Sequence, residues 1–215
     1  MKSIALIGGA GEGLGAALGR RFSKSYEVVL SSRTQGERAD LREEAQVIDL
    51  FERVEKRAPV EVAIFNAGAN FRASILDTPA EMFEKVWRLG CYAGFLFGRE
   101  AARRMIARGK GTILFTGATA SMRGSAQFAA FAAAKGGLRQ VAQSMARELG
   151  PKNIHVAHVV IDGVIDRKRE LNPTNLPADA MLATDAIAEL FWQLHAQPRS
   201  AWTFEADLRP WAEKF

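Results

Sequence analysis

The stretch SIALIGGAGEGLGAALGRRFSK, residues 3–24, decides the fold of this chain. It opens with an apolar run of strand length, breaks into glycines at residues 8–15, and continues as a helical pattern. In that pattern Leu14, Leu18 and Phe22 recur every fourth residue, which is the spacing of one buried helix face. A strand, a glycine turn and a helix in this order are typical of the start of a βαβ unit that binds a dinucleotide.

The glycines of this turn are expected to have three separate tasks. Gly9 makes the tight turn, Gly13 lets the backbone approach a pyrophosphate, and Gly15 lets helix and strand pack closely. The phosphates are then expected on the unpaired N–H groups and the positive dipole end of the helix. The spacing is G-x-x-x-G-x-G rather than the commoner G-x-G-x-x-G, and a lone glycine cluster also fits a flexible turn. The alternation of strands and helices along the chain favours cofactor binding.

Strand and helix patterns alternate through the rest of the sequence. Further strands are predicted at residues 26–30, 46–49, 60–65, 111–115, 154–161 and 201–204. Helices are predicted at residues 51–57, 78–89, 95–108, 129–149 and from 184 onward. The near-continuous apolar run at 154–161 is typical of a parallel strand covered on both faces. We therefore predict one Rossmann-like, doubly wound α/β domain over residues 1–215, with a seven-stranded parallel sheet flanked by helices on both faces.

Composition narrows the classes of protein that fit. The 215 residues suit one domain, and no apolar stretch reaches the ~20 residues of a membrane-spanning helix. Cys91 is the only cysteine, which excludes an internal disulfide and suits the cytosol. The net charge of +5 lies in short, separated clusters that accompany no nucleic-acid-binding module. We expect a cytoplasmic protein without a signal peptide that binds neither nucleic acid nor a membrane.

The end of the second predicted strand bears on the choice of cofactor. Ser31, Ser32 and Arg33 stand where the adenosine ribose of a dinucleotide would lie. An acid in this place binds the ribose 2′-OH of NAD, whereas an arginine suits the 2′-phosphate of NADP. No acid is present, so Ser32 and Arg33 predict NADP as the cofactor, with NAD as the alternative. The competing interpretation is that Arg33 is an ordinary solvated loop charge.

Several motifs occur together in a specific order and spacing. They are Gly9-x-x-x-Gly13-x-Gly15, Asp49 after the third predicted strand, Asn66-Ala67-Gly68 after the fourth, and Lys135 in the long helix. Across nearly the whole chain these residues resemble the short-chain dehydrogenase/reductase family. The resemblance implies an oxidoreductase that binds a nicotinamide dinucleotide.

The same resemblance assigns a role to each motif. It implies that the glycines and the backbone of Leu14 hold the pyrophosphate and that Asp49 faces the adenine amino group. It places Asn66-Ala67-Gly68 under the cofactor and Gly163, after the sixth strand, beside it. It also implies that Lys135 bonds the nicotinamide ribose.

The sequence departs from the family pattern where the chemistry is done. The family's proton donor is a tyrosine four residues before the lysine, and Phe131 stands there. The position of the family's serine is Ala118, and that of its asparagine is Gly90. In the family the lysine ammonium lowers the pKa of the tyrosine phenol while serine holds the carbonyl oxygen. Without these groups, carbonyl reduction by the family's mechanism is not expected.

Other polar residues near these positions are candidate substitutes for the missing groups. Thr116, Thr119 and Ser121 lie close to the missing serine, and Asp162 follows the sixth strand. Ordinary hydrogen-bonded roles are favoured for all four. Structural roles are likewise expected for His155 and His158, and a buried inert thiol for Cys91. No cluster of cysteine, histidine and aspartate has metal-ligand spacing, so no metal is predicted.

Two functions remain open from the sequence. The first is a divergent NADP-dependent oxidoreductase that uses another donor, or a substrate such as an activated alkene that needs none. The second is a non-catalytic NADP-binding sensor or subunit. Residues 166–180, where the family has its substrate lid, offer few apolar anchors, so the substrate cannot be named. The family's four-helix interface maps onto residues 95–108 and 129–149, and it implies a homodimer or homotetramer.

Overall fold

The computed structural model describes residues 2–166, 175–177 and 179–213. Its strands form one seven-stranded sheet in the order β3-β2-β1-β4-β5-β6-β7, and every neighbouring pair is parallel. This confirms the predicted doubly wound α/β class with a seven-stranded parallel sheet. The strands are β1 Ile4–Gly8, β2 Glu27–Ser32, β3 Glu37–Arg38, β4 Val60–Phe65, β5 Gly111–Thr116, β6 Ile154–Ile161 and β7 Glu205–Leu208.

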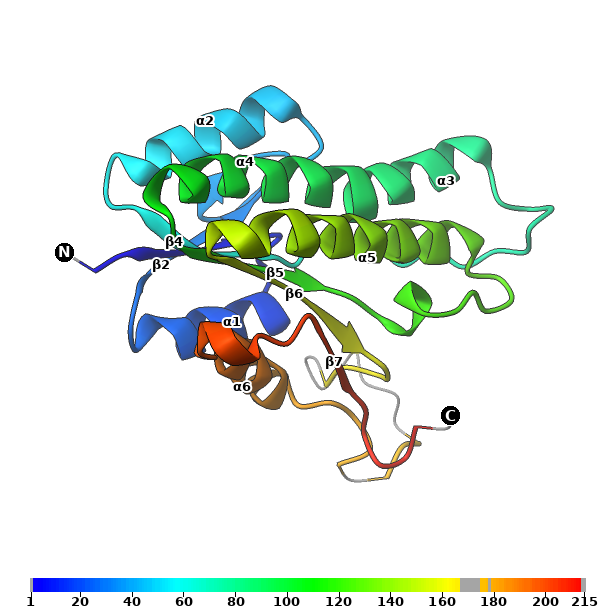
Figure 1. Ribbon diagram of the computed structural model, residues 1–215. Helices are drawn as coiled ribbons and strands as arrows, with labels where there is room; N and C mark the ends of the chain where they lie inside the picture. Colours follow the sequence, from blue (N-terminus) through cyan, green and yellow to red (C-terminus); the bar gives the residue numbers. More distant parts are fainter. Residues whose placement is uncertain (1, 167–174, 178, 214–215) are drawn as a thin grey trace.

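Helices cover both faces of this sheet (Figure 1). They are α1 Leu14–Ser23, α2 Glu44–Glu55, α3 Ala80–Trp87, α4 Ala93–Arg108, α5 Ala129–Leu149 and α6 Thr184–His195. Helices α2, α4 and α5 lie on one face, and α1 and α6 lie on the other. A single π-helical stretch, Arg88–Tyr92, joins α3 to α4. No helix in the described part of the chain is both long and apolar enough to cross a membrane.

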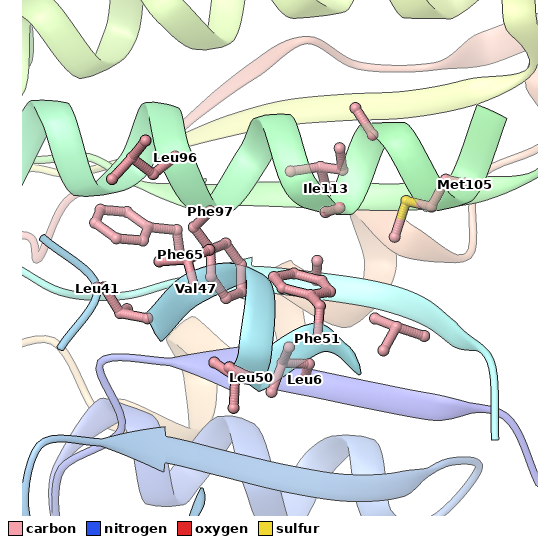
Figure 2. Close-up of a cluster of buried hydrophobic side chains, with 14 of the residues drawn as sticks. Leu6, Leu41, Val47, Leu50, Phe51, Phe65, Leu96, Phe97, Met105 and Ile113 are labelled. Atoms are coloured by element: carbon pink, nitrogen blue, oxygen red, sulfur yellow. The ribbon is translucent and has the colours of Figure 1, made fainter. Parts of the chain in front are cut away.

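Each face of the sheet has its own apolar core. On the α2/α4 side the rings of Phe51 and Phe65 pack against Phe97, with centroids 5.2 and 5.9 Å apart (Figure 2). On the α1/α6 side the fully buried side chains of Phe22 and Phe191 lie in the second cluster. These large side chains bury the inner stripes of the helices, which is the main favourable contribution to folding.

The strand order positions the site. β1 lies between β2 and β4, so the direction of the chain across the sheet reverses at this point. Ligands of open α/β sheets bind outside the carboxyl ends of strands at such a switch point. The glycine turn follows β1 and the Asn66 turn follows β4, so both emerge beside this crevice.

The predicted third strand is wrong. Residues 46–49 lie inside α2, where Val47, Leu50 and Val54 are buried at helical spacing. The short run Gln-Val-Ile-Asp fits either period, and the contacts of α2 with the core decide for the helix. The third strand is instead the two-residue β3, which begins at Glu37, nine residues before the predicted start at residue 46.

The last strand is displaced from its predicted position. Residues 199–201 form a 3₁₀ turn, and β7 begins at Glu205, after the predicted segment 201–204. Its register is set by pairing with β6, in which Glu205 lies beside His158 and Leu208 beside Ile161.

Most of the predicted lid, residues 167–174 and 178, lies outside the described residues.

Candidate cofactor and active site

The glycine turn and the turn after β4 are bound to each other. Gly9 has φ +80°, and a Cβ there would lie 2.5 Å from the Ala67 Cα, so only glycine fits. The Asn66 N–H donates to Gly8 O at 2.8 Å, and the Asn66 side-chain amide donates to Gly9 O at 3.2 Å. These bonds hold the loops after β1 and β4 in one fixed arrangement, with Gly68 exposed at its edge.

The start of α1 has the features of a phosphate site. Gly13 is the N-cap and provides no side-chain hydrogen bond, and no atom lies within 4 Å of a Cβ placed there. At Gly15 a Cβ would lie 2.7 Å from Ala10 Cα, while Leu14 is buried as the first residue of the helix. The Ala16 N–H donates to Gly11 O and the Ala17 N–H to Gly13 O, which leaves the N–H groups of Leu14 and Gly15 without a backbone acceptor among the described residues. The helix dipole favours an anion at this end. The geometry therefore fits a dinucleotide pyrophosphate.

Lys135 connects α5 to this frame. It is only 5% exposed, and its Nζ donates to Thr116 O at 2.7 Å. The Thr116 hydroxyl in turn donates to the Asn66 carboxamide oxygen at 3.1 Å. Burial lowers the pKa of Lys135 to about 8. The lysine predicted from the resemblance thus lies beside the Asn66 turn, with Nζ 3.2 Å from a Cβ placed at Gly68.

The arginine predicted for the 2′-phosphate is exposed, whereas the neighbouring serine is occupied. Arg33 follows β2 and makes no side-chain hydrogen bond or ion pair within the described residues. Ser32 Oγ accepts from the Gln35 and Thr34 N–H groups at 2.8 and 3.2 Å and donates to Gln35 O at 3.0 Å. The hydroxyl of Ser32 is therefore used within the turn.

Asp49 does not lie where a residue after the third strand should lie. It is exposed on α2 and forms a 2.8 Å ion pair with Arg53 one helical turn later. The acid that follows β3 is Asp40, which sequence reasoning missed because β3 has only two residues and no apolar run announces it. Hydrogen bonds from Arg42, the shortest 2.5 Å, hold the pKa of Asp40 below its ordinary value.

The residues that the resemblance places at the family's catalytic positions are apolar or lack a side chain. Phe131 is half-buried in the first turn of α5, one turn before Lys135, and Ala118 follows β5. Gly90 lies in the π-helical stretch, where a Cβ would be 2.9 Å from the Ala134 Cβ of α5. The close approach of the two helices leaves no room for a larger residue at position 90 unless they move. Beside it, burial raises the pKa of the Cys91 thiol, as expected for an inert cysteine.

The hydroxyl groups weighed as substitutes all have protein partners. Thr116 donates to Asn66, Thr119 donates to Asp162 at 2.5 Å, and Ser121 accepts from the Ala118 N–H at 3.1 Å. Asp162 also accepts two bonds from Arg209, at 2.6 and 2.9 Å. Burial opposes its ionisation, but these hydrogen bonds outweigh burial and the pKa of Asp162 is lowered. Each of these groups is hydrogen-bonded, as the sequence interpretation expected.

The histidines of β6 also have structural partners. His158 is fully buried, with Nδ1 3.0 Å from a Glu205 carboxylate oxygen, and Arg139 of α5 donates twice to the same carboxylate. Burial lowers the pKa of His158 to about 4, so the ring is neutral near pH 7. His155 stacks on Trp202 with ring centroids 4.9 Å apart. Both rings join β6 to the segment that forms the sheet edge.

A cavity of about 370 Å³ opens at the carboxyl edge of the sheet. Its lining includes Thr119, the residue that follows Ala118. The cavity lies between the loop after β5 and the ends of β6 and β7, and is lined by Thr119, Met122, Arg123, Val160, Asp162, Glu205, Asp207 and Arg209. This volume falls within the range of small-molecule sites. Gly163 follows Asp162 and packs against the ring of Pro210.

A family model described as short chain dehydrogenase matches residues 3–169. The chain belongs to this family. It is 31% identical over 170 residues to the 3-oxoacyl-[acyl-carrier-protein] reductase MabA of Mycobacterium tuberculosis, covering 75% of this chain and 68% of that protein. It is 30% identical over 195 residues to the cyclic-di-GMP-binding biofilm dispersal mediator protein of Escherichia coli, covering 84% of this chain and 79% of that one.

A solved structure supports the same assignment. The short-chain dehydrogenase from Rhodopseudomonas palustris is 42% identical, and the match covers 97% of this chain and 99% of that chain with a TM-score of 0.85. Dinucleotide binding is a property of the short-chain dehydrogenase family. The glycine turn, the Asn66 turn and Lys135 lie together at the switch point of the sheet, where open α/β sheets bind their ligands.

Proposed function

We propose that this protein is an NADP(H)-binding oxidoreductase of the short-chain dehydrogenase family whose proton donor is not the family's tyrosine. One observation carries the proposal. The glycine turn, Asn66 and Lys135, to which we assign the dinucleotide, are joined by hydrogen bonds, whereas Phe131, Ala118 and Gly90 bring no proton donor to the three positions that complete the family's chemistry.

The described residues divide the binding of the cofactor among them. Gly9, Gly13, Gly15 and the backbone of Leu14 take the pyrophosphate, and Asn66, Ala67 and Gly68 lie beneath it. Lys135 hydrogen-bonds the nicotinamide ribose, and Gly163 borders the same end. We assign the adenine contact to Asp40 rather than Asp49, because Asp40 is the acid that follows β3. When bound, the nicotinamide supplies a hydride.

The proposed chemistry follows from the side chains at and near the positions of the family's proton donors. Phe131 presents an aromatic ring without an acidic proton, and Ala118 presents no hydroxyl to a carbonyl oxygen. The nearby hydroxyls of Thr116 and Thr119 donate to protein oxygens. A hydride acceptor that delocalises its negative charge, such as an activated alkene, has less need of a positioned acid than a simple ketone. We therefore propose activated alkenes as the first substrate class to test.

Arg33 is proposed as the residue that selects NADP over NAD. It is exposed at the carboxyl end of β2, and residues 31–33 include no acid to bind a ribose 2′-OH. A charge-assisted contact of this kind contributes about 1.5–3 kcal/mol. Calorimetric titration with NADPH and NADH tests it: Arg33→Ala should weaken NADPH binding about 10–100-fold and leave NADH binding unchanged. The matched control is Arg38→Ala, which removes an exposed arginine from neighbouring β3. Equal affinity of the wild type for both cofactors contradicts the assignment.

A non-catalytic NADP-binding sensor or subunit is the alternative function. The close contact of Gly90 with Ala134 favours it, because the helices have closed over the position of the family's asparagine. The Escherichia coli relative, which is named for a bound cyclic dinucleotide, also supports a binding role. Incubating the protein with NADPH and a panel of ketones, aldehydes and enones separates the two proposals. Steady NADPH oxidation with any member favours the enzyme; tight NADPH binding without oxidation favours the sensor.

A further inference from the structure

The connection between β2 and β3 is unusually short for two parallel strands. β2 ends at Ser32 and β3 begins at Glu37, with Ser31 beside Glu37 and Ser32 beside Arg38 in the parallel register. Parallel neighbours normally need a crossover of about a dozen residues or more, commonly containing a helix. Here residues 33–36 must turn back at once, at the carboxyl end of β2 where the proposed function places the 2′-phosphate.

Two features hold this turn in one shape. The Ser32 hydroxyl closes it from within, accepting from the N–H groups of Thr34 and Gln35 and donating to Gln35 O. Gly36 closes it from the other end: its φ is +65°, and a Cβ there would overlap the Leu30 carbonyl oxygen. The backbone of residues 33–36, which carries the Arg33 side chain, therefore has one fixed conformation.

Arg33 is the first residue of the turn, and its guanidinium is available. Its side chain is exposed and has no hydrogen bond or ion pair to any residue that the structure describes. Asp40, on which the charge of Arg33 acts, is already bonded to Arg42, and the hydrogen bonds from Arg42 lower the pKa of Asp40 more than the charge of Arg33 does. Glu12, the acid in the glycine turn, also has an interaction partner.

We infer that Ser32 is a positioning residue for NADP: its hydroxyl holds residues 33–36 so that Arg33 meets the 2′-phosphate, and Ser32 itself does not contact the phosphate. A serine hydroxyl has one proton, and that of Ser32 is donated to Gln35 O. Binding a phosphate oxygen would withdraw this proton and open the turn. The inference rests on the proposed NADP preference and refines the sequence expectation that Ser32 and Arg33 act alike.

The test is a double-mutant cycle on cofactor affinity, measured by calorimetry with NADPH and NADH. Ser32→Ala should weaken NADPH binding about 3–10-fold, the cost of ordering a released side chain and loop, and change NADH binding less than twofold. In the Arg33→Ala background the same substitution should change NADPH binding less than twofold, because a residue that acts through Arg33 has nothing left to position. Amide hydrogen exchange of Thr34 and Gln35 should speed up in Ser32→Ala without cofactor.

A conservative variant guards against misfolding. Ser32→Asn should keep the NADPH preference within about twofold, because an asparagine carboxamide oxygen accepts the same two N–H groups in an Asx-turn. Additive losses in the cycle mean that Ser32 binds the phosphate directly and overturn the inference. Unchanged preference in a folded Ser32→Ala, or lost preference in Ser32→Asn, also overturns it. A wild type without any NADPH preference overturns the proposed cofactor as well, so the two failures are distinguishable.

Discussion

At the scale of single residues, we propose a site that keeps the family's binding lysine and lacks its proton-donating groups. Lys135 is buried, donates to Thr116 O and lies near Gly68. Phe131 lies one turn away on the same helix and has no proton to give. The difference between a binding protein and a reductase therefore lies in a few side chains, and substitution can test it directly.

Restoring the donors should restore part of the chemistry. The double variant Phe131→Tyr with Ala118→Ser places a phenol one helical turn from Lys135 and a hydroxyl after β5. We expect NADPH-dependent reduction of simple ketones to rise about 10–10³-fold over wild type, within the range of positioned acid catalysis. The gain should be partial, because Gly90 has no space for the family's asparagine. Initial rates of NADPH oxidation measure it.

Phe131→Leu with Ala118→Ser is the matched control for that experiment and should gain much less, because it lacks the proton donor. A double variant that binds NADPH but reduces no ketone indicates that the whole pocket has changed its use. Robust turnover by the wild type that is abolished by Phe131→Tyr indicates a mechanism that depends on the apolar wall.

Burial of Lys135 predicts how its contribution to stability changes with pH. Its pKa is about 8 when folded and 10.5 in the unfolded reference, so the unfolded chain binds more protons between these values. Stability therefore rises with pH across this window. Relative to Lys135→Met, the wild-type free energy of unfolding should increase by about 3 kcal/mol from pH 7.5 to 10.5. Urea denaturation at several pH values measures it.

An exposed lysine provides the comparison for that titration. Lys85 lies on α3 at the surface, and Lys85→Met should follow the wild-type curve at every pH. If the Lys135→Met and wild-type curves are parallel from pH 7.5 to 10.5, Lys135 is not a buried ammonium in this protein.

At the scale of elements, α3, the π-helical stretch and α4 carry an exposed apolar surface on which we predict assembly. Its exposed large apolar residues include Trp87, Phe95 and Ile106, at 38%, 37% and 40% exposure. Arg99 lies over the ring of Phe95 and leaves the rest of this stripe uncovered. The resemblance to the family predicts that α4 and α5 form a four-helix interface with a second copy.

We predict a homodimer or homotetramer that Phe95→Asp weakens. The substitution removes a large apolar contact and brings a carboxylate that must be desolvated in the interface, beside Arg99, so the dissociation constant should rise at least ~10-fold. Light scattering at micromolar concentration measures the mass. Leu76→Asp, at a 93% exposed position in the loop before α3, is the control and should leave the mass unchanged. A monomeric wild type contradicts the prediction.

At the scale of the whole molecule, acid sensitivity is built into both sides of the sheet. His158 is bonded to Glu205 on the α5 side, and His195 to the Tyr26 hydroxyl at 2.8 Å and Thr112 at 2.9 Å. Burial lowers the pKa of each to about 4, against 6.5 when unfolded. The native state thus keeps both rings neutral while the unfolded chain protonates them.

Stability should therefore be fully present above pH 6.5 and fall as the pH drops towards 4. Each histidine should contribute about 2–3 kcal/mol to that loss by pH 4.5. In His195→Asn the wild-type loss between pH 7 and 4.5 should shrink by this amount, whatever the substitution costs at pH 7. Chemical denaturation at the two pH values gives both numbers. An equal loss in the variant and the wild type contradicts the assignment.

Local patterns in the sequence predicted the features that depend on neighbouring residues. The glycine turn, the apolar run of β6 and the apolar stripe of α5 follow from spacing alone, and so does the parallel α/β class. The absence of a phenol and a hydroxyl at Phe131 and Ala118 is a matter of residue type. No tertiary contact alters it.

Contacts between distant segments decided the rest. Residues 46–49 are helical because Val47 and Leu50 pack against the core. The acid that follows the third strand is therefore Asp40 and not Asp49. The engagement of the Ser32 hydroxyl and the contact of Gly90 with Ala134 depend on the path of the chain in space. A sequence pattern reports periodicity over a few residues, whereas these features depend on which atoms meet after the sheet has formed.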